Sequence, residues 1–459
     1  MLEQINGGKN IFRKQTKRSD PTRIFLMILV ILMGLLLYRE VNTGAVEPLF
    51  MPTPYPTRTA NSYTVEGESN FIAGKLDKAV ESYRKAAELD PTNAEILAEL
   101  ARIQVYSSSL LTTDQERKTR LEDALASIDQ AVEIDPESSN AHAIRALVLD
   151  WYANPILVGD EYKNLLLDAE RDVTQALQID NSNVLALAYN AEILIDQQRW
   201  TQAEQFIQQA MDRDTSLMDV HRIYAYYLES TQNYSLAIDE YKKAAEITPN
   251  LTFLYISIGK NYRQLGYYDT ALEYYDTALE YYDTALEYFE KAADINEQIN
   301  VKDPIPYNEI SKTYSQTGDF FSASRNALKA LVYNPTGPDS YGRLGIVYFK
   351  SRNYEGSILA FQCAIRGCDA DLSCEVRKCD SETDPKIEIQ GLPLTDNTLV
   401  YYYSYGSVLS AMHQKSNNYC EEAMRIFGEV EAIYGADPTV MSIVNPGKAI
   451  CESYGYTLP

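Results

Sequence analysis

The six cysteines are the residues whose spacing most clearly suggests chemistry. Four of them lie within seventeen residues: Cys363, Cys368, Cys374 and Cys379. The other two, Cys420 and Cys451, are further along the chain and well separated. Such residues could form disulfides in an oxidising compartment, hold zinc, or remain free thiols. We favour disulfides, because structural zinc sites usually contain Cys-x2-Cys pairs and the sequence has none. The same absence argues against redox catalysis. The four clustered cysteines allow three pairings, and their spacing does not choose among them.

Other catalytic signals are sparse. The sequence has three histidines. We expect His142 and His221 to be packed or surface residues on helices, and His413 to be exposed in a turn. The sequence contains no Gly-rich phosphate loop, no Gly-x-Ser-x-Gly and no His-Glu-x-x-His. These patterns predict a protein that is not an enzyme and that needs no metal or cofactor.

Charge sets a further expectation. Of 459 residues, 41 are basic and 65 acidic, which gives a net charge of −24. Such a chain is expected to repel nucleic-acid phosphate over a broad surface, so we predict no nucleic-acid partner. The apolar share of 45% is that of a folded protein.

The N-terminal region predicts a membrane helix. Residues 24–38 contain no charge, and as a helix they would measure roughly 22 Å, against a hydrocarbon core of about 30 Å. Six basic and two acidic residues precede them, which by the positive-inside rule places the N-terminus in the cytoplasm and the rest outside it. We predict a basic cytoplasmic tail (1–23), a transmembrane helix or signal anchor (24–41) and a Pro/Thr-rich linker (42–60). A cleaved signal peptide and a buried core helix are the alternatives.

From residue 60 onward the chain repeats itself. The pattern is alanine, a larger apolar residue four positions later, and a second alanine three positions after that. Ala79-Tyr83-Ala86, Ala203-Ile207-Ala210 and Ala237-Tyr241-Ala244 are clear copies. Several successive copies lie 34 residues apart, which is the period of a solenoid built from helical hairpins.

This pattern resembles the tetratricopeptide repeat family. Further residues carry the likeness: Tyr255, Ile258, Gly259, Tyr262 and Gly266; Tyr307, Ile310, Tyr314, Gly318, Ala323, Ala330 and Pro335; Tyr341, Leu344, Gly345 and Tyr348. The resemblance implies an all-α, right-handed superhelical solenoid of about eight to nine repeats. We place repeats at 61–364, an inserted loop with cysteines at 365–397, the last hairpin at 398–437, and a capping helix with a tail at 438–459.

Two further expectations depend on this register. Cys420 begins a second helix and Cys451 ends the capping helix, so antiparallel stacking predicts a disulfide between them. The heptapeptide YYDTALE occurs three times, at 267–273, 274–280 and 281–287. Two added copies supply fourteen residues, so we expect one second helix to be lengthened by about 21 Å.

The resemblance also implies that first helices line a groove that binds other proteins. The residues expected there are Tyr226, Lys260, Arg263, Asn308, Lys312 and Phe349. The family's carboxylate-clamp residues do not carry over, because Thr64 and Glu68 occupy the equivalent positions. We therefore predict a membrane-anchored scaffold for cell-envelope complexes. The alternative is a module that binds glycans or cell wall through groove tyrosines.

Overall fold

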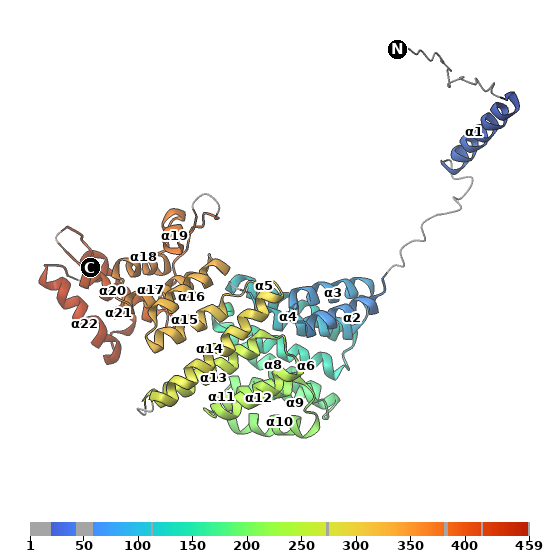
Figure 1. Cartoon of the computed structure of the whole chain (residues 1–459). Coiled ribbons are helices and arrows are strands. Elements are labelled where there is room, and N and C mark those ends of the chain that lie inside the picture. The colour runs from blue at the N-terminus through green and yellow to red at the C-terminus, as the bar shows by residue number, and fades with distance from the viewer. Residues whose placement is uncertain are drawn as a thin grey trace, which may run out of the picture. The chain divides into compact units, whose positions relative to one another are not determined.

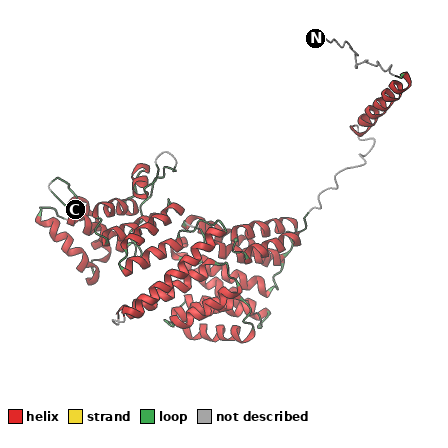
Figure 2. Ribbon diagram, viewed as in Figure 1, coloured by secondary structure: helices red, strands yellow, loops and turns green. Residues whose placement is uncertain are grey.

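A computed structural model describes residues 20–42, 58–111, 113–271, 275–380, 384–414 and 416–457 (Figure 1). The chain divides into two units, Met1–Arg58 and Thr59–Pro459, which we describe separately. In the described residues the regular elements are helices, and the extended pairing is limited to two isolated bridges (Figure 2).

The described part of the first unit is the helix α1 (Pro21–Asn42) with the residues that flank it. Its 22 residues give a length of about 33 Å, and the run from Pro21 to Glu40 is apolar enough to cross a membrane. The helix contains the apolar run on which the sequence prediction was based. Most of the predicted tail and linker, residues 1–19 and 43–57, lies outside the described residues.

The second unit is a stack of helical hairpins followed by a capping helix. The paired helices are α2 (Ala60–Ile72) with α3 (Leu76–Leu89), α4 (Ala94–Ser108) with α5 (Asp114–Ile134), α6 (Ser139–Tyr152) with α8 (Tyr162–Ile179), α9 (Val184–Asp196) with α10 (Trp200–Arg213), α11 (Met218–Ser230) with α12 (Tyr234–Ile247), α13 (Thr252–Ala271) with α14 (Tyr275–Gln298), α15 (Ile305–Thr317) with α16 (Phe320–Tyr333), α17 (Pro338–Lys350) with α18 (Tyr354–Ile365), and α20 (Leu399–Met412) with α21 (Cys420–Tyr434). The shorter elements are α7 (Pro155–Val158), the 3-10 turn η1 (Gly159–Glu161) and α19 (Ala370–Arg377), and the cap is α22 (Pro438–Ser453). The fold is the all-α solenoid that the repeat pattern predicts.

Small residues let the two helices of a hairpin approach each other. Ala79 and Ala86 are completely buried on α3. In α13, a Cβ atom added to Gly259 would lie 2.6 Å from the ring of Phe289 on α14. Gly345 faces Phe361 at the same 2.6 Å in a later hairpin. The repeated glycine and aromatic positions are therefore one packing contact made again in successive hairpins.

The prediction of one lengthened second helix is wrong. The heptapeptide copies extend both members of the sixth hairpin, giving α13 20 residues and α14 24. Residues 272–274, between them, lie outside the described residues. Two long helices can bury one face against each other, as Ala278 and Tyr282 of α14 do beside Gly266 of α13. A single projecting helix would have had no such partner.

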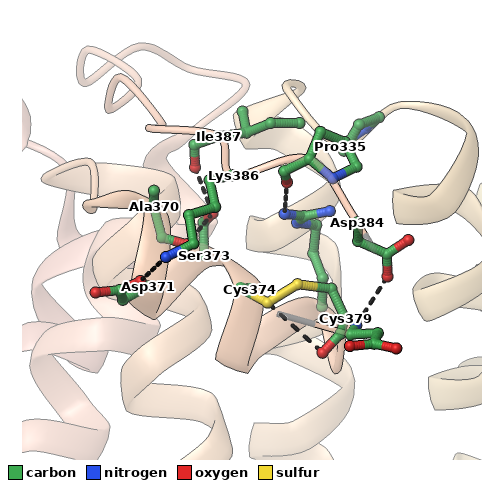
Figure 3. The surroundings of a disulfide bond; sticks show 12 residues. Pro335, Ala370, Asp371, Ser373, Cys374, Cys379, Asp384, Lys386 and Ile387 are labelled. Atoms are coloured by element: carbon green, nitrogen blue, oxygen red, sulfur yellow. Dashed lines mark hydrogen bonds and ion pairs between the residues drawn. A yellow bond between two sulfur atoms is a disulfide. The ribbon is translucent and has the colours of Figure 1, made fainter. Parts of the chain in front are cut away.

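The region predicted as a cysteine-containing loop has a small structure of its own. It contains α19 and an antiparallel bridge between Cys368 and Ile389. Disulfides join Cys363 to Cys368 and Cys374 to Cys379. Around the second disulfide, the Ser373 hydroxyl donates to the Ile387 carbonyl and Lys386 pairs with Asp371 (Figure 3). The first disulfide ties the segment before α19 to α18, and the second joins α19 to the segment that follows it.

Candidate functional site

The first two hairpins lie against the fifth and sixth, which closes one turn of the solenoid. Arg102 of α4 donates to Asp219 of α11 at 3.1 Å, and the hydroxyl of Tyr106 donates to the same carboxylate. The side chain of Asn250 donates to the backbone carbonyl of Ile72 at 2.9 Å. These contacts join residues 113 to 178 positions apart. They enclose the inner faces of the first helices.

A pocket of about 590 Å³ opens on these inner faces. Four successive first helices, α6, α9, α11 and α13, contribute to its wall. Its aromatic lining consists of Trp151, Tyr162, Tyr226, Tyr241 and Phe253. Its charged lining consists of Asp150, Glu192, Asp196 and Arg222. The volume lies within the range of small-ligand sites, about 300–1,000 Å³.

Contacts between neighbouring first helices position the charged groups. Arg222 donates to both oxygens of Glu192 at 2.7 Å. The Tyr226 hydroxyl donates to Asp196 at 2.6 Å. Each of these contacts joins residues 30 positions apart. Equivalent positions of neighbouring repeats are 34 residues apart. The partners here lie about one helical turn, or four residues, closer in sequence than equivalent positions, which gives 30.

The carboxyl groups differ in how their charge is compensated. Glu192 forms the bidentate pair with Arg222 and also accepts from the Trp151 indole N–H at 3.3 Å. Asp150 is 5% exposed, and its Oδ1 atom has no hydrogen-bond partner among the described residues. Burial raises the pKa of Asp150 well above its ordinary value, and the nearby charges of Asp196 and Glu192 raise it further.

Asp196 lies on the same wall of the pocket but is reached by solvent. Loss of hydration beside the surrounding helices raises the pKa of Asp196 to about 6. The hydrogen bond from Tyr226 acts in the opposite direction. The pocket thus contains three carboxyl groups against one guanidinium, and that guanidinium is already paired.

A second cleft, of about 300 Å³, lies between α15, α17 and α20 and is basic. Lys312, Arg343 and Lys350 line it, and the buried Ser315 hydroxyl beside them has no partner among the described residues. Loss of hydration lowers the pKa of Lys312, and the charges of Arg263, Arg343 and Lys260 lower it further, while Glu309 raises it. Arg343 is also paired with Asp339 at 2.6 Å.

The groove residues expected from the sequence are divided among several places. Tyr226 lines the acidic pocket. Lys260 is exposed and lines an adjoining cleft of about 300 Å³ that shares Trp151 and Phe253 with the pocket. Arg263 differs from expectation, because it is 7% exposed and pairs with the buried Glu309 at 2.5 Å. Its charge is therefore neutralised inside the solenoid rather than offered to a ligand.

The remaining expected groove residues lie toward the C-terminus. Asn308 and Lys312 line the basic cleft. Phe349 is half-buried and packs beside Tyr354, with ring centroids 6.1 Å apart. The structure therefore does not bring the six residues together into one site.

The histidines and the last cysteine pair have structural surroundings. His142 and His221 are buried beside Asp172 and Glu240, at 3.0 and 2.6 Å. The expectation of an exposed His413 is wrong: the ring is 8% exposed and accepts from the backbone N–H of Cys420 at 3.1 Å. It ends α20 and orients the start of α21. Cys420 and Cys451 form a disulfide with an S–S distance of 2.03 Å.

Sequence reasoning missed Asp150, Glu192, Asp196 and Arg222. One signal could have found them: charged residues recur on first helices whose other residues are apolar, as in the segment Leu149-Asp150-Trp151. Such positions face the inside of the turn. Which of these charged side chains pair depends on the rotation between one repeat and the next. The 34-residue period of the sequence does not give that rotation.

Comparison with known proteins agrees with this architecture. A family model described as TPR repeat matches residues 67–105, and one described as tetratricopeptide repeat matches residues 254–282. The chain contains tetratricopeptide repeats. No curated protein sequence matches this repeat protein. Tetratricopeptide repeats support the role of a protein–protein interaction scaffold.

Several solved structures are similar to this chain, and the two of human IFIT1 share its fold. The human IFIT1 dimer with PPP-AAAA has a TM-score of 0.53 and 15% identity, over 88% of this chain and 92% of that one. Human IFIT1 with m7Gppp-AAAA gives 0.53 and 16%, over 87% and 91%. A thermophilic tetratricopeptide repeat protein from Thermus thermophilus gives 0.37 and 16%, over 44% and 98%.

The IFIT1 structures contradict one prediction. We excluded nucleic acid as a partner from the net charge, yet IFIT1 has this fold and was solved with PPP-AAAA and with m7Gppp-AAAA. A net charge is a sum over the whole surface, whereas a ligand meets only the groups of one cleft. The exclusion of nucleic acid is therefore withdrawn.

Proposed function

We propose that this protein is a membrane-tethered scaffold that binds segments of other proteins along the inner face of its solenoid and assembles them in the cell envelope. One observation carries the proposal: the inner faces of four successive first helices leave a pocket of about 590 Å³ between them. In a solenoid that served only as a spacer, core side chains would fill this space. An extended segment can contact several repeats at once, which suits such a surface.

The membrane and compartment parts of the proposal have separate support. α1 is long and apolar enough to span a bilayer, and the residues before it are basic, which favours a cytoplasmic N-terminus. The solenoid then lies on the other side, where disulfides persist. The structure pairs all six cysteines, as such a compartment favours.

In-cell crosslinking of the full-length protein, followed by affinity capture and mass spectrometry, tests this function. The test variant is Lys260→Glu with Lys312→Glu, which reverses two exposed charges on inner helices. The matched control is Lys78→Glu with Lys85→Glu, two exposed lysines of the second helix α3. We expect the test variant to lose a partner that the control and the native protein retain. Equal capture by all three would contradict the proposal.

A second candidate is an anionic ligand such as RNA in the basic cleft. The arrangement of Lys312, Arg343 and Lys350 supports it, together with the fold shared with the IFIT1 structure solved with PPP-AAAA. Nuclease treatment of the captured material separates the two candidates. A partner that survives nuclease supports the protein scaffold, and recovery of RNA fragments crosslinked to α15 or α17 supports the second candidate.

A further inference from the structure

The charges of the inner pocket are unbalanced. Its lining contains the carboxyl groups of Asp150, Glu192 and Asp196, and its only described lining cation is Arg222. The bidentate pair compensates the charges of Glu192 and Arg222. Two carboxyl groups therefore remain without an ionic partner inside the pocket.

Asp150 provides an independent indication that a hydrogen-bond donor is missing from the pocket. It is 5% exposed, and its Oδ1 atom has neither a hydrogen-bond donor among the described residues nor solvent. Leaving such a buried atom unsatisfied destabilises the folded state. Asp150 also lines the pocket, so a ligand in the pocket would lie beside this carboxyl group.

The other walls suit a flat or elongated cation. Trp151 and Phe253 are half-buried, and Trp151 is held in place by its N–H donating to Glu192 at 3.3 Å. Aromatic faces attract guanidinium and ammonium groups through the negative charge of their ring faces. A protein side chain already shows this preference here, because the Arg222 guanidinium lies 5.8 Å from the centre of the Trp151 ring.

We propose that the inner pocket binds an arginine or lysine side chain of a bound protein segment, with Asp150 and Asp196 as its ionic partners. This inference rests on the proposed scaffold function and names the kind of residue that the pocket selects. The incoming cation supplies the missing donor to Asp150. Because its charge also favours the ionised carboxylates, it binds more tightly than an uncharged donor of the same shape.

Tryptophan fluorescence gives a direct test, because the chain has two tryptophans. Trp200 is 37% exposed at the start of α10, so Trp200→Phe leaves Trp151 as the reporter. Full-length protein in detergent micelles is titrated with the blocked peptide Gly-Arg-Gly, with the same peptide containing neutral citrulline, and with spermidine. We expect a saturable change with the arginine peptide and at least tenfold weaker binding of the citrulline peptide.

Two variants assign the effect to the pocket. Asp150→Asn and Asp196→Asn should each weaken binding of the arginine peptide at least tenfold, whereas Asp239→Asn, on the exposed face of α12, should not. Asp150→Asn removes an unpartnered carboxyl and should fold normally; if it does not, the solvent-reached Asp196→Asn decides. Equal binding of the two peptides, or binding unchanged in the folded variants, would overturn the inference. So would spermidine binding tenfold tighter than the arginine peptide, because the pocket would then serve a free polyamine.

The outcome is separable from the proposed function. If the peptide titration fails while partner capture still depends on the groove charges, only the inference about the basic side chain falls. If capture loses its dependence on the groove, the scaffold proposal falls whatever the peptides do.

Discussion

Replacing Asp219 by alanine should release the first two hairpins from the closed turn. Asp219 is 3% exposed and accepts from three side chains: Tyr106, Tyr189 at 2.9 Å and Arg102 at 3.1 Å. Two of these partners, Tyr106 and Tyr189, are completely buried, so their hydroxyls would lose an acceptor with no water to replace it.

The size of the destabilisation depends on which contacts the partners of Asp219 would keep after the substitution. Arg102 would keep Glu99, which it contacts at 2.6 Å, so its charge would not be left alone. Loss of one partner from a buried ion pair costs about 3–5 kcal/mol, and the retained Glu99 places this case near 3. A loss of about 3 kcal/mol in the free energy of closure corresponds to roughly a hundredfold change in opening.

Hydrogen–deuterium exchange measures this opening locally. We expect amides of α2 and α4 to exchange about a hundred times faster in Asp219→Ala, with α17 to α22 unchanged. The control is Asp239→Ala, an exposed aspartate on α12. If α2 and α4 exchange equally in both variants, the reasoning about closure is refuted.

Three other predictions concern stability. Gly259→Ala should lower the free energy of unfolding by about 1–3 kcal/mol in urea titrations, because the added methyl would meet the Phe289 ring at 2.6 Å. Replacing Cys420 and Cys451 together by serine should lower the stability of α22 by about 2–4 kcal/mol, read as faster amide exchange in that helix. Burial raises the pKa of Asp303 to about 6. The folded state then holds a proton that the unfolded state releases near pH 4, so stability should fall as pH rises from about 4 to 6. Asp303→Asn should flatten that part of the profile of urea midpoint against pH.

Each of these has a contradicting result. An unchanged urea midpoint for the alanine variant would show that the helices can separate without cost. Unchanged exchange in α22 would mean that the disulfide does not restrain the cap. A pH profile that keeps its slope in the asparagine variant would assign the titration to another group.

The hairpins could be predicted because each one needs small residues at the same positions, where its two helices pack closely. Ala79 and Ala86 are completely buried, and Gly259 admits the ring of Phe289, so the alanine, glycine and aromatic pattern is a direct record of helix packing. The disulfide partners Cys420 and Cys451 lie at helix ends, where antiparallel stacking determines which ends are neighbours.

The inner pocket could not be predicted from the same pattern. It depends on small rotations that add up over several repeats until Arg102 reaches Asp219, 117 positions away. The same accumulation places Arg263 in a buried pair rather than in the groove. The division of the YYDTALE copies depends on where the turn falls, and seven residues, close to two helical turns, suit either helix equally.

Photo-crosslinking from the inner face tests the central claim most directly. A photoreactive phenylalanine derivative replaces Tyr226, which lines the inner pocket, or Leu236, which is 56% exposed on α12. We predict that full-length protein irradiated in its own cells forms a discrete crosslinked product with another protein from position 226 and none from position 236. No protein crosslink from position 226, or the same product from both positions, would contradict the claim that the inner face binds the partner.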